Sequence, residues 1–280
     1  MSKEVAGTTV VMLGNAAIAR GAYEAGVKVS AAYPGTPSTE ISENLVKYKD
    51  ELYSEWSPNE KVATEVAIGA SISGVRALVS MKHVGVNVAS DPLYTISYSG
   101  VNGGLVLVAA DDPGIYSSQN EQDSRMVARA AMVPVIEPSD SEEARMFIKR
   151  AFELSEQYDT PIMFRTTTRL AHSQGVVHLE ERQQIPDKPY EKNIAKNVMM
   201  PGNAIKRHLV VEERLKKMAA DAATLDINKV EYNDTKIGVI TSGIPYQYVK
   251  EVLPNASVLK LGLVHPLPKT LIEEFASRVD

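Results

Sequence analysis

Short apolar and β-branched runs alternate with small-residue helical segments over the first 174 residues, and this alternation constrains the fold more than any other feature. Buried strands are predicted at residues 8–13, 28–33, 76–80, 105–110, 133–136 and 161–166. Helices are predicted at residues 16–25, 37–48, 60–73 and 141–157. Strands separated by helices form βαβ units, which build parallel sheets. We therefore expect an α/β fold in which a parallel sheet carries helices on both faces.

This alternation stops near residue 174, so residues 1–174 are predicted to form one domain. Residues 175–234 are mostly polar and aperiodic, with one helix expected at 210–222, and they predict a long connector that wraps the first domain. A second α/β pattern covers residues 235–280, with strands at 236–241 and 257–261 and helices at 246–253 and 269–279. Two strands do not make an independent sheet. We therefore expect a partial α/β domain there, truncated or completed by a partner.

Composition and charge exclude several classes of protein. A hydrophobic content of 44% with 23% charged residues is ordinary for a globular protein, and a net charge of −5 with scattered Lys and Arg argues against binding to nucleic acid. Residues 1–7 lack the apolar core of a secretory signal, and no run approaches the roughly 18 apolar residues that span a membrane. We expect a cytoplasmic protein. The absence of cysteine excludes disulfides, thiolate zinc sites and cysteine-bound iron–sulfur clusters within this sequence.

The first candidate binding turn lies at residues 33–39, Tyr-Pro-Gly-Thr-Pro-Ser-Thr. Ligands of open α/β sheets bind at the carboxyl ends of the strands, where strand-to-helix turns lie. This turn displays Gly35, the Thr36 hydroxyl and free backbone N–H groups at a helix start, which suits a carboxylate or a phosphate. The alternative is that Thr36 only caps its helix.

The second turn places Glu60 at the start of the helix 60–73. In one interpretation Ser57 is the N-cap, Pro58 takes the first helical position, and Glu60 completes a capping box. In the other, Glu60 is a buried acid that shares a proton with a ligand nitrogen. The small residues that follow, such as Ala63 and Ala67, permit close approach of a ring or another backbone. The local sequence does not decide between the two interpretations.

Two further turns carry polar residues. Lys82 and His83 follow the strand 76–80, and Gly85 permits close approach there, although a solvated loop explains the same residues. The stretch 111–125 is rich in acids, amides and hydroxyls and could be a substrate loop or a subunit contact. Its Asp-Asp-Pro-Gly start favours an ordinary turn over a magnesium site. We expect no metal site, since the histidines lack metal-ligand spacing. The common nucleotide-binding fingerprints are also missing.

Taken together, these segments resemble the pyrimidine-binding domain of the 2-oxoacid:ferredoxin oxidoreductases, which are thiamine diphosphate enzymes. The resemblance is greatest to the alpha subunits that act on indolepyruvate, and it covers nearly the whole chain. The segments that carry it are residues 13–21, 32–40, the Glu60 helix, 81–85, 117–125 and 197–201. By the same resemblance, residues 235–280 are expected to be part of a transketolase C-terminal-like domain.

The resemblance implies roles for individual residues. Glu60 matches the acid that hydrogen-bonds the aminopyrimidine of thiamine diphosphate, and Gly35 and Gly85 are expected to border the cofactor. Thr36 matches a hydroxyl near the substrate carboxylate, and Lys82 with His83 occupy the turn expected near the reacting carbons. The implied reaction is oxidative decarboxylation of an aryl 2-oxoacid to an acyl-coenzyme A, with electrons passed to ferredoxin.

The sequence departs from this family in lacking the Gly-Asp-Gly magnesium motif and all cluster-binding cysteines. Mg²⁺ and [4Fe-4S] clusters are therefore expected only on a missing part or a partner, such as a diphosphate-binding half or a second subunit of beta or gamma type. We expect an oligomer whose thiamine diphosphate site is shared. Two alternatives stay open: another 2-oxoacid such as pyruvate is the substrate, or the chain is a non-catalytic assembly or regulatory subunit.

Overall fold

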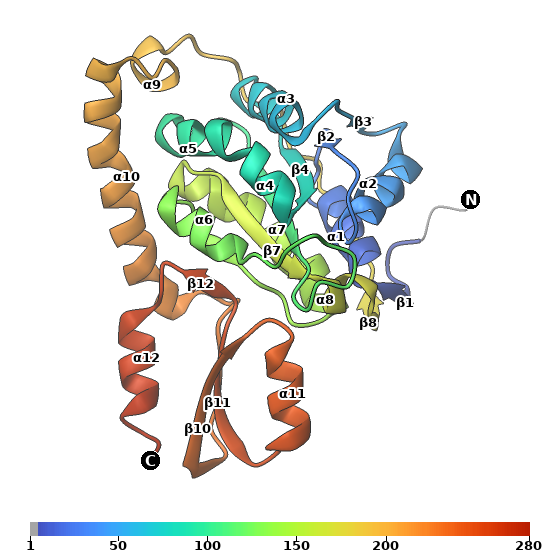
Figure 1. The fold of residues 1–280 in the computed structure, drawn as a ribbon, viewed down its shortest axis with the longest axis vertical. Coiled ribbons are helices and arrows are strands. Elements are labelled where there is room, and N and C mark those ends of the chain that lie inside the picture. Colours follow the sequence, from blue (N-terminus) through green and yellow to red (C-terminus); the bar gives the residue numbers. More distant parts are fainter. Residues whose placement is uncertain (1–4) are drawn as a thin grey trace.

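A seven-stranded, mostly parallel sheet forms the centre of the molecule (Figure 1). The computed structural model describes residues 5–280; residues 1–4, part of the segment examined for a secretory signal, lie outside the described residues. Only β12 runs antiparallel, against β6. The strand order is β12 (Leu263–His265), β6 (Val135–Ile136), β7 (Ile162–Thr167), β5 (Leu105–Asp111), β4 (Ala77–Lys82), β2 (Val29–Ala32) and β3 (Tyr53–Trp56).

Helices cover both faces of this sheet, which confirms the predicted fold class. Side chains alternate across a strand, so Val106 and Val108 of β5 join one core cluster while Leu105 and Leu107 join the other. The first cluster is covered by α1 (Gly14–Glu24), α2 (Thr39–Leu45) and α7 (Ser141–Tyr158). The second is covered by α3 (Glu60–Ile72), α4 (His83–Val88), α5 (Ser90–Ser99) and α6 (Ser124–Ala130).

The strand predicted at residues 8–13 does not belong to the parallel sheet. Instead β1 (Thr9–Leu13) pairs antiparallel with β8 (Gln174–His178) in a separate two-stranded ribbon, next to the short helix α8 (Thr168–His172). Most side chains of β1 are exposed or half-buried. A short apolar run does not distinguish a central strand from a peripheral ribbon, and this explains the wrong prediction.

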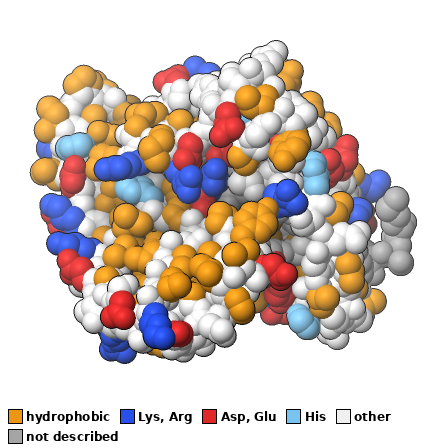
Figure 2. Space-filling model, turned by 60° about the horizontal axis from the view of Figure 1, so that its bottom comes forward, with side chains coloured by type: hydrophobic (Ala, Val, Ile, Leu, Met, Phe, Trp, Pro, Cys, Tyr) orange, Lys and Arg blue, Asp and Glu red, His pale blue; other side chains and the backbone are white. Residues whose placement is uncertain are grey.

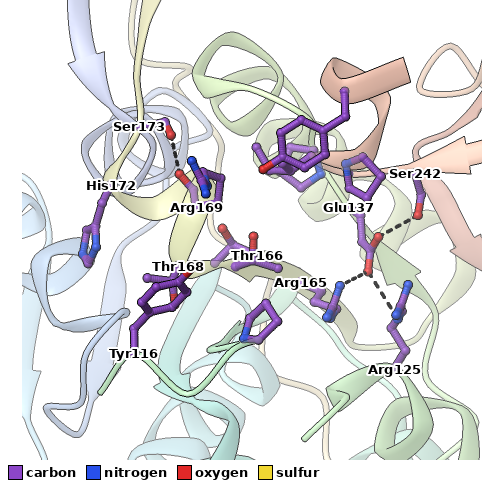
Figure 3. A pocket seen from close by; sticks show the side chains of 17 residues that line it. Tyr116, Arg125, Glu137, Arg165, Thr166, Thr168, Arg169, His172, Ser173 and Ser242 are labelled. Atoms are coloured by element: carbon purple, nitrogen blue, oxygen red, sulfur yellow. Dashed lines mark hydrogen bonds and ion pairs between the residues drawn. The ribbon is translucent and has the colours of Figure 1, made fainter. Parts of the chain in front are cut away.

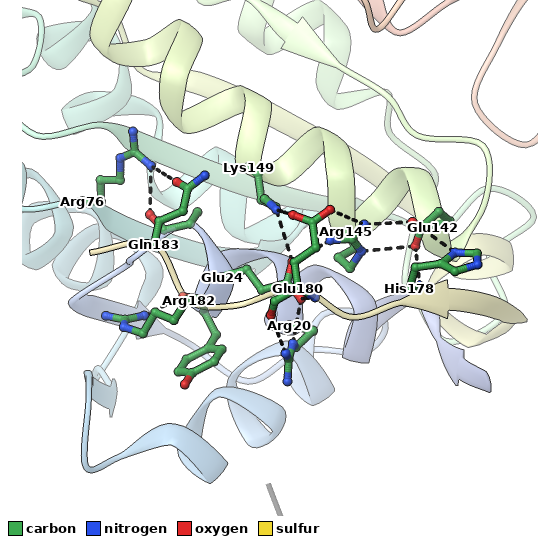
Figure 4. Close-up of polar contacts among 12 residues, drawn as sticks. Arg20, Glu24, Arg76, Glu142, Arg145, Lys149, His178, Glu180, Arg182 and Gln183 are labelled. Carbon is green, nitrogen blue, oxygen red and sulfur yellow. Dashed lines mark hydrogen bonds and ion pairs between the residues drawn. The ribbon is translucent and has the colours of Figure 1, made fainter. Parts of the chain in front are cut away.

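A buried ion network holds the ribbon, α1 and α7 together (Figure 4). Glu24 of α1 is fully buried and accepts hydrogen bonds from Arg20 at 2.8 Å, from Arg145 at 2.6 Å and from the Glu180 backbone N–H at 2.8 Å. Lys149 bridges Glu24 and Glu180. The chain that leaves β8 is therefore fixed against α1 and α7 through Glu180.

The connector is more regular than its sequence predicted. After the short helix α9 (Ile194–Asn197), helix α10 (Pro201–Asp221) begins well before the expected residue 210, with proline at its first position, where a missing N–H is tolerated. Arg207 and Arg214 fasten α10 to the end of α5 by donating hydrogen bonds to the Tyr98 and Ser97 carbonyls.

Short 3₁₀ turns occupy Val46–Tyr48 and Ala222–Thr224. No helix within residues 5–280 is long and apolar enough to cross a membrane.

The last part of the chain forms a second block. Its three-stranded sheet has the order β10 (Asp234–Ser242), β11 (Ala256–Leu261) and β9 (Lys229–Glu231), with helices α11 (Pro245–Val252) and α12 (Lys269–Ala276). Hydrophobic side chains gather on the surface at this end of the molecule (Figure 2), and Ile237, Ile240 and Val252 are among the exposed ones. Because β12 joins the main sheet, the block is tied to the first domain. The division at residues 174 and 234 stays a proposal.

Candidate functional site

Glu60 lies at the carboxyl edge of the main sheet as the first residue of α3, and its side chain is only 9% exposed. The N-cap is Asn59, whose side chain accepts the Val62 N–H at 3.0 Å. Ser57 instead donates to Glu55. The capping-box interpretation is therefore wrong, because Asn59 caps the helix and Glu60 stands at the first helical position.

The Glu60 carboxylate is pressed against Gly85 of α4. A Cβ atom at Gly85 would lie 2.5 Å from Glu60 Oε1 and 2.6 Å from Glu60 Cγ. Any side chain at position 85 would therefore displace the carboxylate. Within residues 5–280, no group donates a hydrogen bond to this carboxylate. Its oxygens are not among the fully buried atoms without a partner, so the carboxylate of this largely buried residue stays within reach of a ligand donor.

Lys82 and His83 form the junction between β4 and α4 and do not lie in a solvated loop. Lys82 Nζ donates to the Ser117 carbonyl at 2.7 Å, and His83 Nε2 lies 3.1 Å from the Asn120 carbonyl. Since a carbonyl only accepts, Nε2 is assigned the proton. His83 is 1% exposed, and its Nδ1 is buried with no partner among the described residues. These two residues thus hold the loop 112–123.

The turn before α2 adjoins Lys82. A Cβ atom at Gly35 would lie 3.2 Å from Lys82 Cβ, so the two turns touch. Helix α2 begins at Thr39 with Ser38 as its N-cap, which shows that the predicted helix start at Thr36-Pro37 is wrong and that Thr36 does not cap. Thr36 is exposed, and its hydroxyl has no partner among the described residues. It is therefore open to a ligand.

Most of the candidate residues are connected to one another by direct contacts or by adjacency in the sequence. Gly35 meets Lys82, which precedes His83 directly, and Gly85 meets Glu60. The sequence did not indicate the backbone carbonyls of Ser117 and Asn120, which receive the two basic side chains. A backbone acceptor leaves no mark in the sequence, so residue patterns could not have found them.

Two acids at the junction of β5 and the loop 112–123, Asp111 and Asp112, serve the structure of this loop. Asp112 accepts hydrogen bonds from the Ser117 N–H at 2.8 Å, from Ser118 at 2.5 Å and from Thr168 at 2.7 Å. Burial raises the pKa of Asp112, but these hydrogen bonds outweigh burial and lower that pKa to about 2. Asp111 accepts hydrogen bonds from Ser124 and Arg165.

The predicted turn is confirmed by the Ile115 N–H, which donates to the Asp112 carbonyl at 3.1 Å. Residues 5–280 contain no cluster of three or more His, Asp or Glu suited to a metal.

Comparison with known families decides the class of this protein. The family described as pyruvate flavodoxin/ferredoxin oxidoreductase, thiamine diphosphate-binding, matches residues 20–237. The chain belongs to this family. The resemblance inferred from the sequence is thereby confirmed, and the buried, unpartnered Glu60 carboxylate beside Gly85 fits the nitrogen-bearing ring of thiamine diphosphate.

Curated relatives narrow the comparison. The chain is 46% identical over 292 residues to the indolepyruvate oxidoreductase subunit IorA of Archaeoglobus fulgidus, covering 99% of this chain and 46% of that protein. The IorA subunit of Pyrococcus horikoshii is 46% identical over 283 residues, covering 96% of this chain and 44% of that protein. The chain thus spans about half the length of the curated relatives it matches.

A solved structure shares the fold. The 2-oxoglutarate:ferredoxin oxidoreductase from Magnetococcus marinus superposes with a TM-score of 0.80 at 18% identity, over 97% of this chain and 57% of that chain. At this identity the likeness concerns the fold alone. It covers both the main sheet and the second block.

Proposed function

We propose that this chain supplies the pyrimidine-binding half of a shared thiamine diphosphate site in an indolepyruvate:ferredoxin oxidoreductase. The observation that carries the proposal is Glu60, a largely buried residue at the carboxyl edge of the sheet whose carboxylate has no hydrogen-bond donor among the described residues. Bound thiamine diphosphate supplies the nucleophilic carbon and the electron sink that decarboxylation of a 2-oxoacid requires. The IorA relatives support indolepyruvate, an aryl 2-oxoacid, as the substrate.

Each candidate residue has a proposed task. Glu60 holds a proton at a ring nitrogen of the cofactor, and Gly35 and Gly85 leave space where a side chain would collide. Thr36 offers its free hydroxyl to the substrate carboxylate. Lys82 and His83 position the loop 112–123 over the site through its carbonyls. Together they bind and orient ligands and keep one proton mobile.

The complete activity needs parts that this sequence does not contain. With no cysteine and no magnesium motif, the [4Fe-4S] clusters and Mg²⁺ are assigned to other parts of the assembled enzyme. A diphosphate-binding half or second subunit completes the site, coenzyme A receives the acyl group, and ferredoxin receives the electrons. The relatives are named as subunits, which supports an oligomer, and we place the enzyme in the cytoplasm.

Glu60→Gln tests this proposal in the assembled enzyme. The amide keeps the size of the side chain but cannot take up a proton, so exchange of the cofactor C2 hydrogen with solvent should fall to the uncatalysed rate. Thermal unfolding should change little, because the carboxylate has no hydrogen-bond partner to lose among the described residues. The control is Glu65→Gln, an exposed acid on the same helix, which should leave exchange unchanged.

Three outcomes would contradict parts of the proposal. Near-normal hydrogen exchange in Glu60→Gln would remove the proton-sharing role. Turnover indifferent to Glu60 would favour a regulatory subunit. Pyruvate that competes with indolepyruvate and is consumed faster would reassign the substrate.

A further inference from the structure

A cavity of about 600 Å³ lies between the first domain and the second block (Figure 3). Its walls come from the carboxyl ends of strands in both sheets: Pro113 follows β5, Glu137 follows β6, Thr168 follows β7 and Ser242 ends β10. Open α/β sheets bind ligands at these ends. The volume is within the range of pockets that hold drug-sized ligands. We call this cavity the interblock cleft.

One side of the cleft is a closed charge network. Glu137 accepts a hydrogen bond from Arg165 at 2.7 Å and one from Ser242 at 2.9 Å, and it lies 3.6 Å from Arg125 (Figure 3). Arg165 also donates to Asp111, and Arg125 pairs with Asp123 at 2.8 Å. The two guanidinium groups and three carboxylates of this network satisfy one another and sum to a net charge of −1, so the network shapes the cleft and supplies no positive charge for an anion.

Arg169 differs from the other two arginines of the cleft. Its side chain is exposed, and no acid within residues 5–280 pairs with its guanidinium. The neighbouring His172 lies 3.5 Å from Glu40 and so has a partner. A free guanidinium presents a planar fork of donors that matches phosphate and carboxylate oxygens. Among the cleft arginines, Arg169 is thus the one whose guanidinium has no acidic partner within residues 5–280.

Thr166 is a second, independent sign of a ligand. This residue belongs to the cleft wall, is 2% exposed, and its hydroxyl has no hydrogen-bond partner among the described residues. Buried hydroxyls without a partner are rare and call for an explanation. Because Thr166 lines the same cleft as Arg169, its hydroxyl is the buried polar group that a ligand there could satisfy.

Aromatic surface completes the lining. Tyr116, from the loop 112–123, is 72% exposed, and Tyr248, from α11, is 51% exposed. Tyrosine rings that remain this exposed at a cleft offer flat surfaces to a planar ring. The cleft therefore combines a free guanidinium with two aromatic faces contributed by different blocks.

We propose that the interblock cleft binds a nucleoside phosphate, with its phosphate at Arg169 and its base against Tyr116 and Tyr248. The cleft is larger than a single 2-oxoacid needs, and this favours the nucleotide. Ser117, the neighbour of Tyr116, receives the Lys82 hydrogen bond, so an occupant also contacts the loop that Lys82 and His83 hold. The proposal does not depend on the function proposed for Glu60.

Calorimetric titration of the purified protein with ADP tests this site. Saturable binding is expected, weakened at least tenfold in Arg169→Gln and also weakened in Thr166→Val, which removes only the hydroxyl. The control is Arg278→Gln, an exposed arginine that follows α12, pairs with Glu274 and does not line the cleft, so this variant should bind as the wild type does. Thermal unfolding of each variant establishes that it is folded.

Adenosine, inorganic phosphate and phenylpyruvate are titrated in parallel. Weaker binding of adenosine and of phosphate than of ADP supports a site that uses both ends of the nucleotide. The proposal is overturned by the absence of saturable ADP binding up to about 1 mM, or by equal affinities in the wild type and Arg169→Gln. Binding of phenylpyruvate that depends on Arg169, without binding of ADP, would overturn it in favour of an aryl 2-oxoacid.

Discussion

The contact between Gly85 and Glu60 makes a residue-scale prediction. In Gly85→Ala the new Cβ would stand 2.5 Å from Glu60 Oε1, so the carboxylate must move away from its place. The protein should fold, since a flexible side chain can yield, but thiamine diphosphate binding and C2 hydrogen exchange in the assembled enzyme should weaken at least tenfold. Cofactor titration and exchange rates measure this loss.

Gly69 supplies the matched control on α3. A Cβ atom there meets nothing within 4 Å, so Gly69→Ala should stabilise the helix by about 0.5–1 kcal/mol and leave cofactor binding intact. Wild-type cofactor binding in Gly85→Ala would show that Glu60 does not need its observed position.

The sequence identified the residues of this site more readily than their contacts. The sequence left Glu60 undecided between a cap and a proton-sharing acid because both interpretations use the same residues. The extended backbone of Asn59 rules out the capping box that starts at Ser57, and the sequence does not reveal that conformation. Lys82 and His83 reach carbonyls 35 and 37 positions away. Such contacts depend on the path of the backbone, which side-chain patterns do not encode.

At the scale of elements, the stability of the folded loop 112–123 should depend on pH through Asp112. Its pKa is lowered from 3.8 to about 2, so the folded loop favours the carboxylate. The stabilisation is complete above pH about 4 and is lost as the pH falls towards about 2. Amide-exchange protection of Ser117, which donates to Asp112, should therefore decrease across this window. In Asp112→Asn the decrease should disappear, and equal profiles in both proteins would refute the assignment.

Within the main sheet, the inner strands were predicted, whereas an edge strand and a short covering helix were missed. The inner strands β4 and β5 are buried on both faces and appear as continuous apolar runs. The edge strand β3, Tyr-Ser-Glu-Trp, has no such run and was missed. Helix α4 was missed because it follows β4 without a loop and its six residues, with Gly85 among them, are too few to show a helical period.

At the scale of the whole molecule, the second block is a wall of the cleft and a neighbour of the main sheet. The sequence predicted its α/β pattern, but not that β12 leaves it to pair with β6. Strand pairing is made by backbone groups that every residue carries, and three residues contain too little pattern to reveal a partner. The position of the block therefore had to come from the structure.

Lys260 of β11 is a buried side-chain contact between the two parts. It is 1% exposed, pairs with Glu143 of α7, and lies over the rings of Phe147 at 5.3 Å and Tyr246 at 5.0 Å. Removal of one partner from a buried ion pair costs about 3–5 kcal/mol. Lys260→Ala should therefore destabilise the second block by about 3 kcal/mol, at the low end because Glu143 keeps some contact with water.

The matched control is Lys229→Ala. Lys229 is the register partner of Lys260 on β9, but its side chain is 62% exposed, and its pair with Glu231 is worth about 0–1 kcal/mol. Amide hydrogen exchange should show a loss of protection in β10 and β11 of Lys260→Ala, with β4 and β5 unchanged. Equal protection of β11 in the two variants would mean that β12 and the other interblock contacts hold the block without Lys260. Lys260 contacts Tyr246, which directly follows the cleft residue Pro245, so opening of the block in Lys260→Ala should also weaken ADP binding in the cleft, while Lys229→Ala should leave it unchanged.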